Sequence, residues 1–269
     1  MKLEIDGIRY DVDMVGEGYP LVLLHGFTGN SATWLPFCKQ WTTHSSLIMI
    51  DIIGHGRTDA PVESERYQMD RVVNDISLIL QQLNIDKADF LGYSMGGRLA
   101  LSFAAKYPDK IRKLVLESAS PGLKTETERD ERRQRDEKLA TSIIDKGIEN
   151  FVDNWEGIPL FQSQKNLPQQ VQNQIREQRL MNSVTGLANS LIGMGTGAQK
   201  SWWEYLDHVS CDVLLITGEL DEKFCKIANE MLGRLKNSKM MVVEGCGHAI
   251  HVEQAGKFGT IVSEFVQST

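Results

Sequence analysis

The chain has 269 residues, and its 36 acidic and 29 basic side chains give a net charge of −7. Hydrophobic residues make up 41% and charged residues 24%, which excludes disordered, collagen-like and coiled-coil proteins. Mild acidity also argues against a nucleic-acid partner, because phosphate binding needs clustered lysine and arginine. We therefore expect one folded domain with an insertion.

Membrane, secretion and metal signals are absent from the sequence pattern. No apolar run approaches the roughly 18 residues that a membrane-spanning helix needs. Charged residues occur throughout segment 1–12, where a signal peptide would be apolar. Four cysteines lack the spacing of zinc ligands and are interpreted as free thiols: Cys38, Cys211, Cys225 and Cys246. These features predict a cytoplasmic protein with no membrane insertion, no metal and no cofactor.

The chain opens with a predicted β-hairpin. Apolar residues alternate at Leu3 and Ile5, an Asp6-Gly7 turn follows, and the alternation resumes at Ile8. Short continuous apolar runs then recur at 21–24, 47–53, 88–92, 114–116, 213–216 and 240–243. Such runs, without polar alternation, are typical of parallel strands that are covered on both faces.

Helical patterns at 69–83 and 98–107 separate these runs. Strands that alternate with helices predict an α/β fold with a mostly parallel, doubly wound sheet. This alternation of strands and helices stops between Pro121 and Lys200, where the sequence predicts mostly polar helices. We therefore expect a core formed by 1–120 and 201–269, with 121–200 as a helical cap over the carboxyl ends of the strands.

A serine flanked by glycines follows the predicted strand at 88–92. Gly92-Tyr93-Ser94-Met95-Gly96 has the G-x-S-x-G pattern of a nucleophile elbow, and a predicted helix follows it. Glycines at these two positions remove Cβ atoms that would collide with the neighbouring strand and helix. The alternative interpretation is a glycine-rich structural turn.

Such a serine needs a histidine and an acid. Asp221 follows the strand at 213–216, and His248 follows the last predicted strand in a glycine-rich loop. The order Ser, Asp, His, with each residue after a separate strand, predicts a Ser94–Asp221–His248 triad. The segment His25-Gly26-Phe27 follows the strand at 21–24, so we assign an oxyanion hole to the backbone N–H groups of Phe27 and Met95.

With these motifs the chain resembles the α/β-hydrolase family over essentially its whole length. Segments 92–98, 132–136, 182–188 and 194–199 are similar to the 2-succinyl-6-hydroxy-2,4-cyclohexadiene-1-carboxylate synthases of menaquinone biosynthesis. This resemblance implies a lyase that eliminates pyruvate from an enolpyruvyl-bearing cyclohexene without cofactor or metal. It also implies that Ser94 acts as a base and not as a nucleophile.

The resemblance further implies a small polyanionic substrate with three carboxylates, held by arginines. Guanidinium groups pair with both oxygens of a carboxylate at once. The assigned arginines are Arg98, Arg179 and one from the first cap helix, for which the Arg-x-x-Asp pattern favours Arg133 over Arg132. Assigned aromatic contacts are Tyr93, Trp155 and Phe161, and packing inside the cap is the alternative for the last two.

Two other functions use the same fold. A carboxylic-ester or C–C bond hydrolase would use the same triad through an acyl-enzyme, and a ligand receptor would use no catalysis at all. The triad motif does not separate lyase from hydrolase. Arginines in the pocket favour a polyanion, whereas a general esterase needs an apolar acyl pocket. Monomer and small homo-oligomer both remain open.

Overall fold

The computed structural model describes residues 1–268, and its centre is an eight-stranded sheet in the order β1-β2-β4-β3-β5-β6-β7-β8. The pairs β1–β2 and β2–β4 are antiparallel, and the others are parallel. The strands are β1 (Lys2–Ile5), β2 (Ile8–Val15), β3 (Tyr19–Leu24), β4 (Ser45–Ile50), β5 (Ala88–Tyr93), β6 (Ile111–Glu117), β7 (Asp212–Gly218) and β8 (Ser238–Val243). The predicted doubly wound α/β fold is confirmed.

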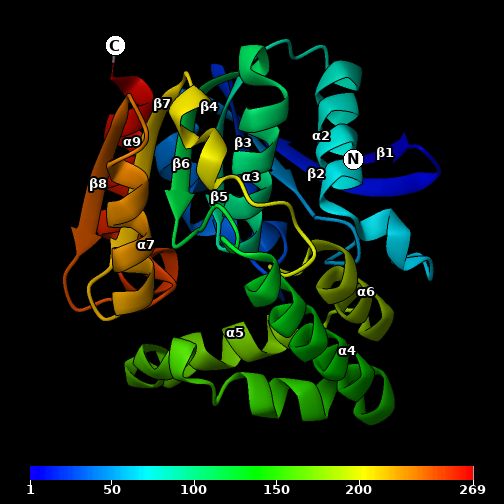
Figure 1. The fold of residues 1–269 in the computed structure, drawn as a ribbon. Helices are drawn as coiled ribbons and strands as arrows, with labels where there is room; N and C mark the ends of the chain where they lie inside the picture. The colour runs from blue at the N-terminus through cyan, green and yellow to red at the C-terminus, as the bar shows by residue number, and fades with distance from the viewer. Residues whose placement is uncertain (269) are drawn as a thin grey trace.

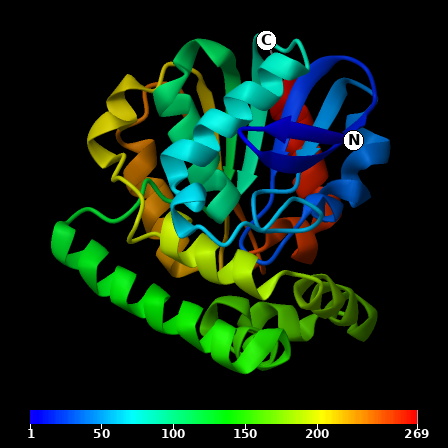
Figure 2. The ribbon, with the colours of Figure 1, turned by 90° about the vertical axis from the view of Figure 1, so that its right-hand side faces the viewer.

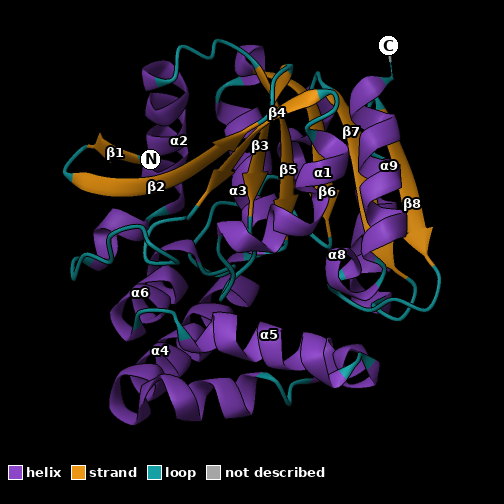
Figure 3. Ribbon diagram, turned by 180° about the vertical axis from the view of Figure 1, so that it is seen from behind, coloured by secondary structure: helices purple, strands orange, loops and turns teal. Residues whose placement is uncertain are grey.

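Helices cover both faces of this sheet (Figures 1 and 3). They are α1 (Cys38–Trp41), α2 (Met69–Gln82), α3 (Met95–Lys106), α4 (Glu126–Trp155), α5 (Gln169–Leu180), α6 (Val184–Met194), α7 (Glu222–Leu232), α8 (Ile250–Glu253) and α9 (Ala255–Gln267). Side chains alternate along each strand, so Val22 and Phe90 join one core with α2, α3 and α7. Their neighbours Leu21 and Leu91 join the other core, with α1 and α9.

The apolar run at 47–53 is the one predicted strand that ends clearly early. Strand β4 stops at Ile50, because the buried carboxylate of Asp51 caps the following loop. It accepts hydrogen bonds from the backbone N–H groups of Ser31, at 2.6 Å, and Arg57, at 2.7 Å. Apolar composition alone could not predict that end, since Ile52 and Ile53 are buried as loop residues.

Between β6 and β7 the described chain contains helices and no strand. Helix α4 begins at a capping box formed by Thr125 and Glu128, and it bends at Gly147, where φ is 78°. Helices α4, α5 and α6 gather at the end of the sheet toward which the parallel strands run (Figures 1 and 2). This segment therefore lies over the edge at which ligands bind in open α/β sheets.

Helix α6 packs against the core at a point where a glycine of the helix meets a glycine of the core. A Cβ atom on Gly186 would overlap the backbone of Gly54, which lies in the loop after β4. We expect Gly186→Ala to lower the free energy of unfolding by about 1–3 kcal/mol, because neither backbone can retreat. Thermal melts measure this change.

Gly233→Ala is the matched control for that substitution. Gly233 follows α7 with right-handed helical φ and ψ angles, and the nearest atoms to an added Cβ lie 3.6 Å and 3.9 Å away. Its melting temperature should stay the same or rise slightly, because alanine restricts the unfolded chain. Equal melting temperatures for Gly186→Ala and the unmodified protein would contradict the close approach of α6 to the core.

Candidate active site

Ser94 lies in a sharp turn between β5 and α3. Its φ of 50° and ψ of −104° are strained for a residue with a side chain, and its N–H donates to the carbonyl of Glu117 on β6 at 2.9 Å. A Cβ atom on Gly96 would overlap the carbonyl of Leu24 in the adjacent strand β3. Glycine there lets α3 start close beneath β3, and the turn presents the serine hydroxyl at the sheet edge.

The three predicted triad residues meet in the structure. His248 Nδ1 lies 2.6 Å from Asp221 Oδ2, and His248 Nε2 lies 3.0 Å from Ser94 Oγ. Because a carboxylate only accepts hydrogen bonds, Nδ1 donates to Asp221 and Nε2 is free to take the serine proton. Asp221 and His248 are 8% and 1% exposed, so water competes little for either group. In this geometry His248 can accept the hydroxyl proton of Ser94, which lets Ser94 Oγ act on a substrate.

The backbone groups assigned to the oxyanion hole are unoccupied donors. Within residues 1–268 the N–H groups of Phe27 and Met95 donate to no acceptor. Phe27 follows β3 and Met95 opens α3, and β3 pairs directly with β5. Two adjacent strand ends therefore supply free N–H groups beside the serine, as an oxyanion requires.

A pocket of about 190 Å³ surrounds the serine hydroxyl. Core and segment 121–200 both line it. The predicted residues on its wall are Phe27, Tyr93, Ser94, Met95, Arg98, Trp155, Phe161 and His248. Trp155 packs edge-on against Phe27 and Phe161, with ring centroids 5.4 Å and 5.9 Å apart. These aromatic side chains form an apolar part of the wall of the pocket that also holds Ser94 and His248.

Arg98 is a partly buried cation on the pocket wall, one turn after Ser94 on α3. Its guanidinium donates to the carbonyl of Met194 at 2.7 Å and to the side chain of Gln199, and it forms no ion pair with a described carboxylate. Burial, and then the nearby charge of Arg132, lower the pKa of Arg98 to about 9. It is still protonated at neutral pH, and its positive charge would be stabilised by an anionic ligand.

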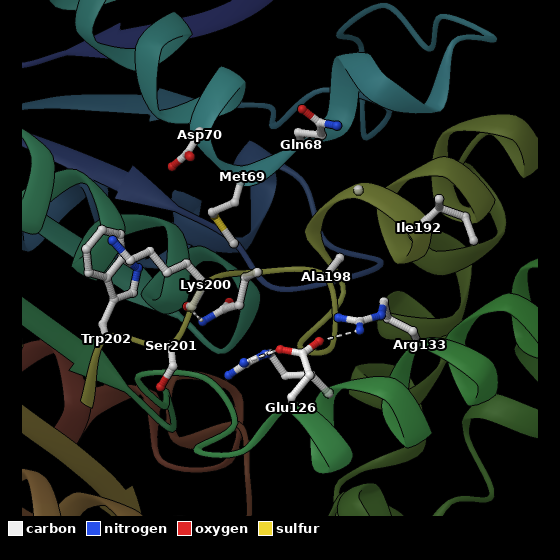
Figure 4. A pocket seen from close by; sticks show the side chains of 13 residues that line it. Gln68, Met69, Asp70, Glu126, Arg133, Ile192, Ala198, Lys200, Ser201 and Trp202 are labelled. Atoms are coloured by element: carbon white, nitrogen blue, oxygen red, sulfur yellow. Dashed lines mark hydrogen bonds and ion pairs between the residues drawn. The ribbon is translucent and has the colours of Figure 1, made fainter. Parts of the chain in front are cut away.

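The structure places the two candidate arginines of the first cap helix, Arg132 and Arg133, on different surfaces. The structure places Arg132 on the wall of the serine pocket, whereas Arg133 lines a different groove of about 710 Å³. Figure 4 shows this groove, with Arg133 beside Glu126. The two residues form a 2.6 Å ion pair, and Arg133 also pairs with Asp130. Successive helical residues differ in direction by about 100°, and the four-residue pattern could not reveal which one faced inward.

Arg179, the third assigned arginine, does not line the serine pocket. It lies against the ring of Phe161, with its guanidinium carbon 4.8 Å from the ring centroid, and lines a small neighbouring cavity. Glu156, at 3.5 Å, and the side-chain oxygen of Gln164, at 3.2 Å, are its partners. Tyr93 and Phe161 line both cavities, whereas Arg179 lines only the smaller of these two.

Sequence reasoning missed several residues of the site. Phe224, one turn after Asp221, lies with its ring centroid 4.6 Å from that of His248, and Lys223 joins it on the pocket wall. Glu253 accepts a 2.7 Å hydrogen bond from the N–H of Gly247 and so supports the His248 loop. The only sequence signal for these residues is their closeness to Asp221 and His248 along the chain.

In the described part of the chain, no group of three or more His, Cys, Asp or Glu side chains could hold a metal ion. In the same residues no helix has both the length and the apolar character to cross a membrane.

The chain belongs to the α/β-hydrolase family, because residues 19–255 match the model described as "alpha/beta hydrolase fold". It is 50% identical to a Bacillus subtilis (strain 168) protein provisionally named 2-succinyl-6-hydroxy-2,4-cyclohexadiene-1-carboxylate synthase, over 98% of this chain and 96% of that protein. The protein of Photorhabdus laumondii with that name is 30% identical, over 91% and 84% of the two chains.

Solved structures give the same picture. The chain is similar to MenH from S. aureus, with a TM-score of 0.92 and 37% identity over 95% of this chain and 97% of that one. It also resembles an esterase from Exiguobacterium antarcticum, with a TM-score of 0.84 and 23% identity over 99% of each chain. The esterase likeness shows the fold alone.

Proposed function

We propose that this protein is a 2-succinyl-6-hydroxy-2,4-cyclohexadiene-1-carboxylate synthase of menaquinone biosynthesis. The substrate would be 2-succinyl-5-enolpyruvyl-6-hydroxy-3-cyclohexene-1-carboxylate, which carries three carboxylates. The observation that carries the proposal is Arg98, a partly buried cation that forms no ion pair with a carboxylate among the described residues and lines the same pocket as the triad. The names of relatives at 50% and 30% identity support the same reaction.

In this proposal Ser94, His248 and Asp221 act together as a general base. Ser94 Oγ takes the ring proton at the carbon that bears the succinyl carbonyl, while its own proton moves to His248 Nε2. The electron pair forms an enolate, whose oxygen accepts from the N–H groups of Phe27 and Met95. As the enolate collapses, the ring double bond shifts and the bond from the ring carbon to the enolpyruvyl oxygen breaks. Pyruvate leaves as its enolate, which takes the proton held on His248 Nε2.

Substrate binding falls to the cations and aromatic side chains of the pocket. We assign carboxylate binding to Arg98 and Arg132, and aromatic contacts to Tyr93, Trp155 and Phe161. We assign Arg179 to the binding of a substrate carboxylate that reaches the neighbouring cavity. We further propose that residues 121–200 act as a cap on the core, 1–120 and 201–269, and that the enzyme works in the cytoplasm without a cofactor, as a monomer or small homo-oligomer.

The test is a direct comparison of two substrates. Purified protein is given the enolpyruvyl precursor, and pyruvate release is followed through a coupled dehydrogenase. In parallel it is given 4-nitrophenyl acetate. We expect kcat/KM for pyruvate release to exceed that for the ester by several orders of magnitude, because only the precursor engages the arginines. Ester hydrolysis without pyruvate release would replace this proposal with the hydrolase alternative.

A further inference from the structure

A buried acid lies behind Arg132. Asp136 follows it by one helical turn on α4 and is 4% exposed, and its Oδ1 accepts a 2.8 Å hydrogen bond from Arg132 Nε. The other oxygen, Oδ2, is buried without a hydrogen-bond partner. Exposed pairs four residues apart on a helix contribute little, but this pair is partly withdrawn from water and is oriented by the helix.

Three elements converge at this carboxylate. It lies against the backbone of Gly195, at the end of α6, where an added Cβ would contact Oδ2. The adjacent residue, Met194, accepts the hydrogen bond from Arg98. Burial raises the pKa of Asp136, and the charges of Arg132 and Arg98 oppose that rise. One carboxylate is thus set against two arginines at one end of the serine pocket.

The hydrogen bond from Nε leaves the far side of the Arg132 guanidinium open. Its terminal nitrogens have no hydrogen-bond or ion-pair partner in the described residues, and Arg132 lines the pocket. A guanidinium held through Nε presents a planar edge of donors that matches a carboxylate. Without that restraint the long side chain could turn toward solvent, because it is 38% exposed.

We propose that Asp136 is a positioning residue that holds Arg132 in the pocket, so that Arg132 and Arg98 together receive one substrate carboxylate. Two cations and one buried anion leave a single net positive charge at this end, which matches one carboxylate. The proposal rests on the proposed function for the identity of the substrate. Its electrostatic part requires only that the ligand be a carboxylate.

The test is a double-mutant cycle on Asp136 and Arg132. Asp136→Ala should lower kcat/KM for pyruvate release on the order of ten- to a hundred-fold, mostly through KM, because a misplaced binding group costs that much. In the Arg132→Ala background the same change should have less than a twofold effect, because a residue that acts only through Arg132 has nothing left to position. Asp136→Asn should retain part of the activity, since its amide oxygen can still accept from Nε.

Asp130→Asn is the matched control on the same helix. Asp130 pairs with Arg133, which faces the other groove, so this variant should keep the unmodified kcat and KM. If Asp136→Ala lowers kcat/KM by the same factor in the unmodified protein and in the Arg132→Ala background, the proposal is overturned. Asp136 would then have a structural role only. Should Asp136→Ala fail to fold, the cycle is run with Asp136→Asn, and the same comparison decides.

Binding of citrate, a tricarboxylate that does not react, separates this proposal from the proposed function. Calorimetry on the same variants should show citrate binding that weakens at least fivefold in Asp136→Ala. That result without any pyruvate release would remove the proposed reaction and keep the role of Asp136. Equal affinity in both proteins, or no binding to the unmodified protein, would overturn the positioning role even if pyruvate is released.

Discussion

Ser94→Ala is expected to lower pyruvate elimination roughly 10²- to 10⁴-fold, which is the usual contribution of a positioned general base. His248→Ala and Asp221→Asn should each cause a severe loss as well. Combining two of these changes should cost little more than one, because the three residues act as a unit. Substrate should still bind to Ser94→Ala, since in the proposed complex the carboxylates contact arginines and not the hydroxyl. Coupled pyruvate assays and calorimetry measure the two quantities.

The same residue also distinguishes a base from a nucleophile. A base mechanism passes through no covalent enzyme intermediate, whereas a hydrolase builds an acyl-enzyme and shows a burst. We therefore expect rapidly quenched enzyme to have its unmodified mass during turnover. Deuterium at the ring carbon that loses its proton should slow the reaction wherever chemistry limits the rate. A kinetically competent adduct on Ser94 would contradict the base mechanism.

The fold was predictable because its determinants are local. Continuous apolar runs mark strands that are covered on both faces, and every run predicted as a parallel strand overlaps a strand of the sheet. Chain order then placed Ser94, Asp221 and His248 at one sheet edge, since parallel strands end on the same side. The contacts at 2.6 Å and 3.0 Å follow from that topology together with the turn at Ser94.

The binding residues were harder to predict because they depend on how helices are rotated and packed. Arg132 and Arg133 are neighbours with the same chemistry, and only the packing of α4 against α6 decides which one faces the pocket. Arg179 is buried, as expected of a binding residue, but its guanidinium lies against the ring of Phe161 and it lines a neighbouring cavity, not the serine pocket. Neither fact has a signature in a single sequence, because both arise from contacts between distant segments.

Arg98→Ala should lower kcat/KM for the polyanionic substrate roughly ten- to more than a hundred-fold, which corresponds to about 1.5–3 kcal/mol for one charge-assisted contact. Arg98→Lys should recover only part of this loss, because lysine keeps the charge but lacks the planar fork. Arg133→Ala is the matched control, since Arg133 lines the other groove, and its kinetics should not change. Initial rates of pyruvate release measure all three.

Although Arg98→Ala should be less active, its folded state should be as stable as that of the unmodified protein or more stable. Burial lowers the pKa of Arg98 in the folded protein to about 9, well below its ordinary value, so folding is disfavoured while the group is protonated in both states. This cost to folding is fully present at pH 7. It decreases only as the pH rises above about 9, where Arg98 begins to lose its proton in the folded state. Removing the cation therefore offsets the loss of its hydrogen bonds to Met194 and Gln199. Thermal melts at pH 7 should show an unchanged or higher melting temperature, and a large decrease together with full activity would make Arg98 a structural residue.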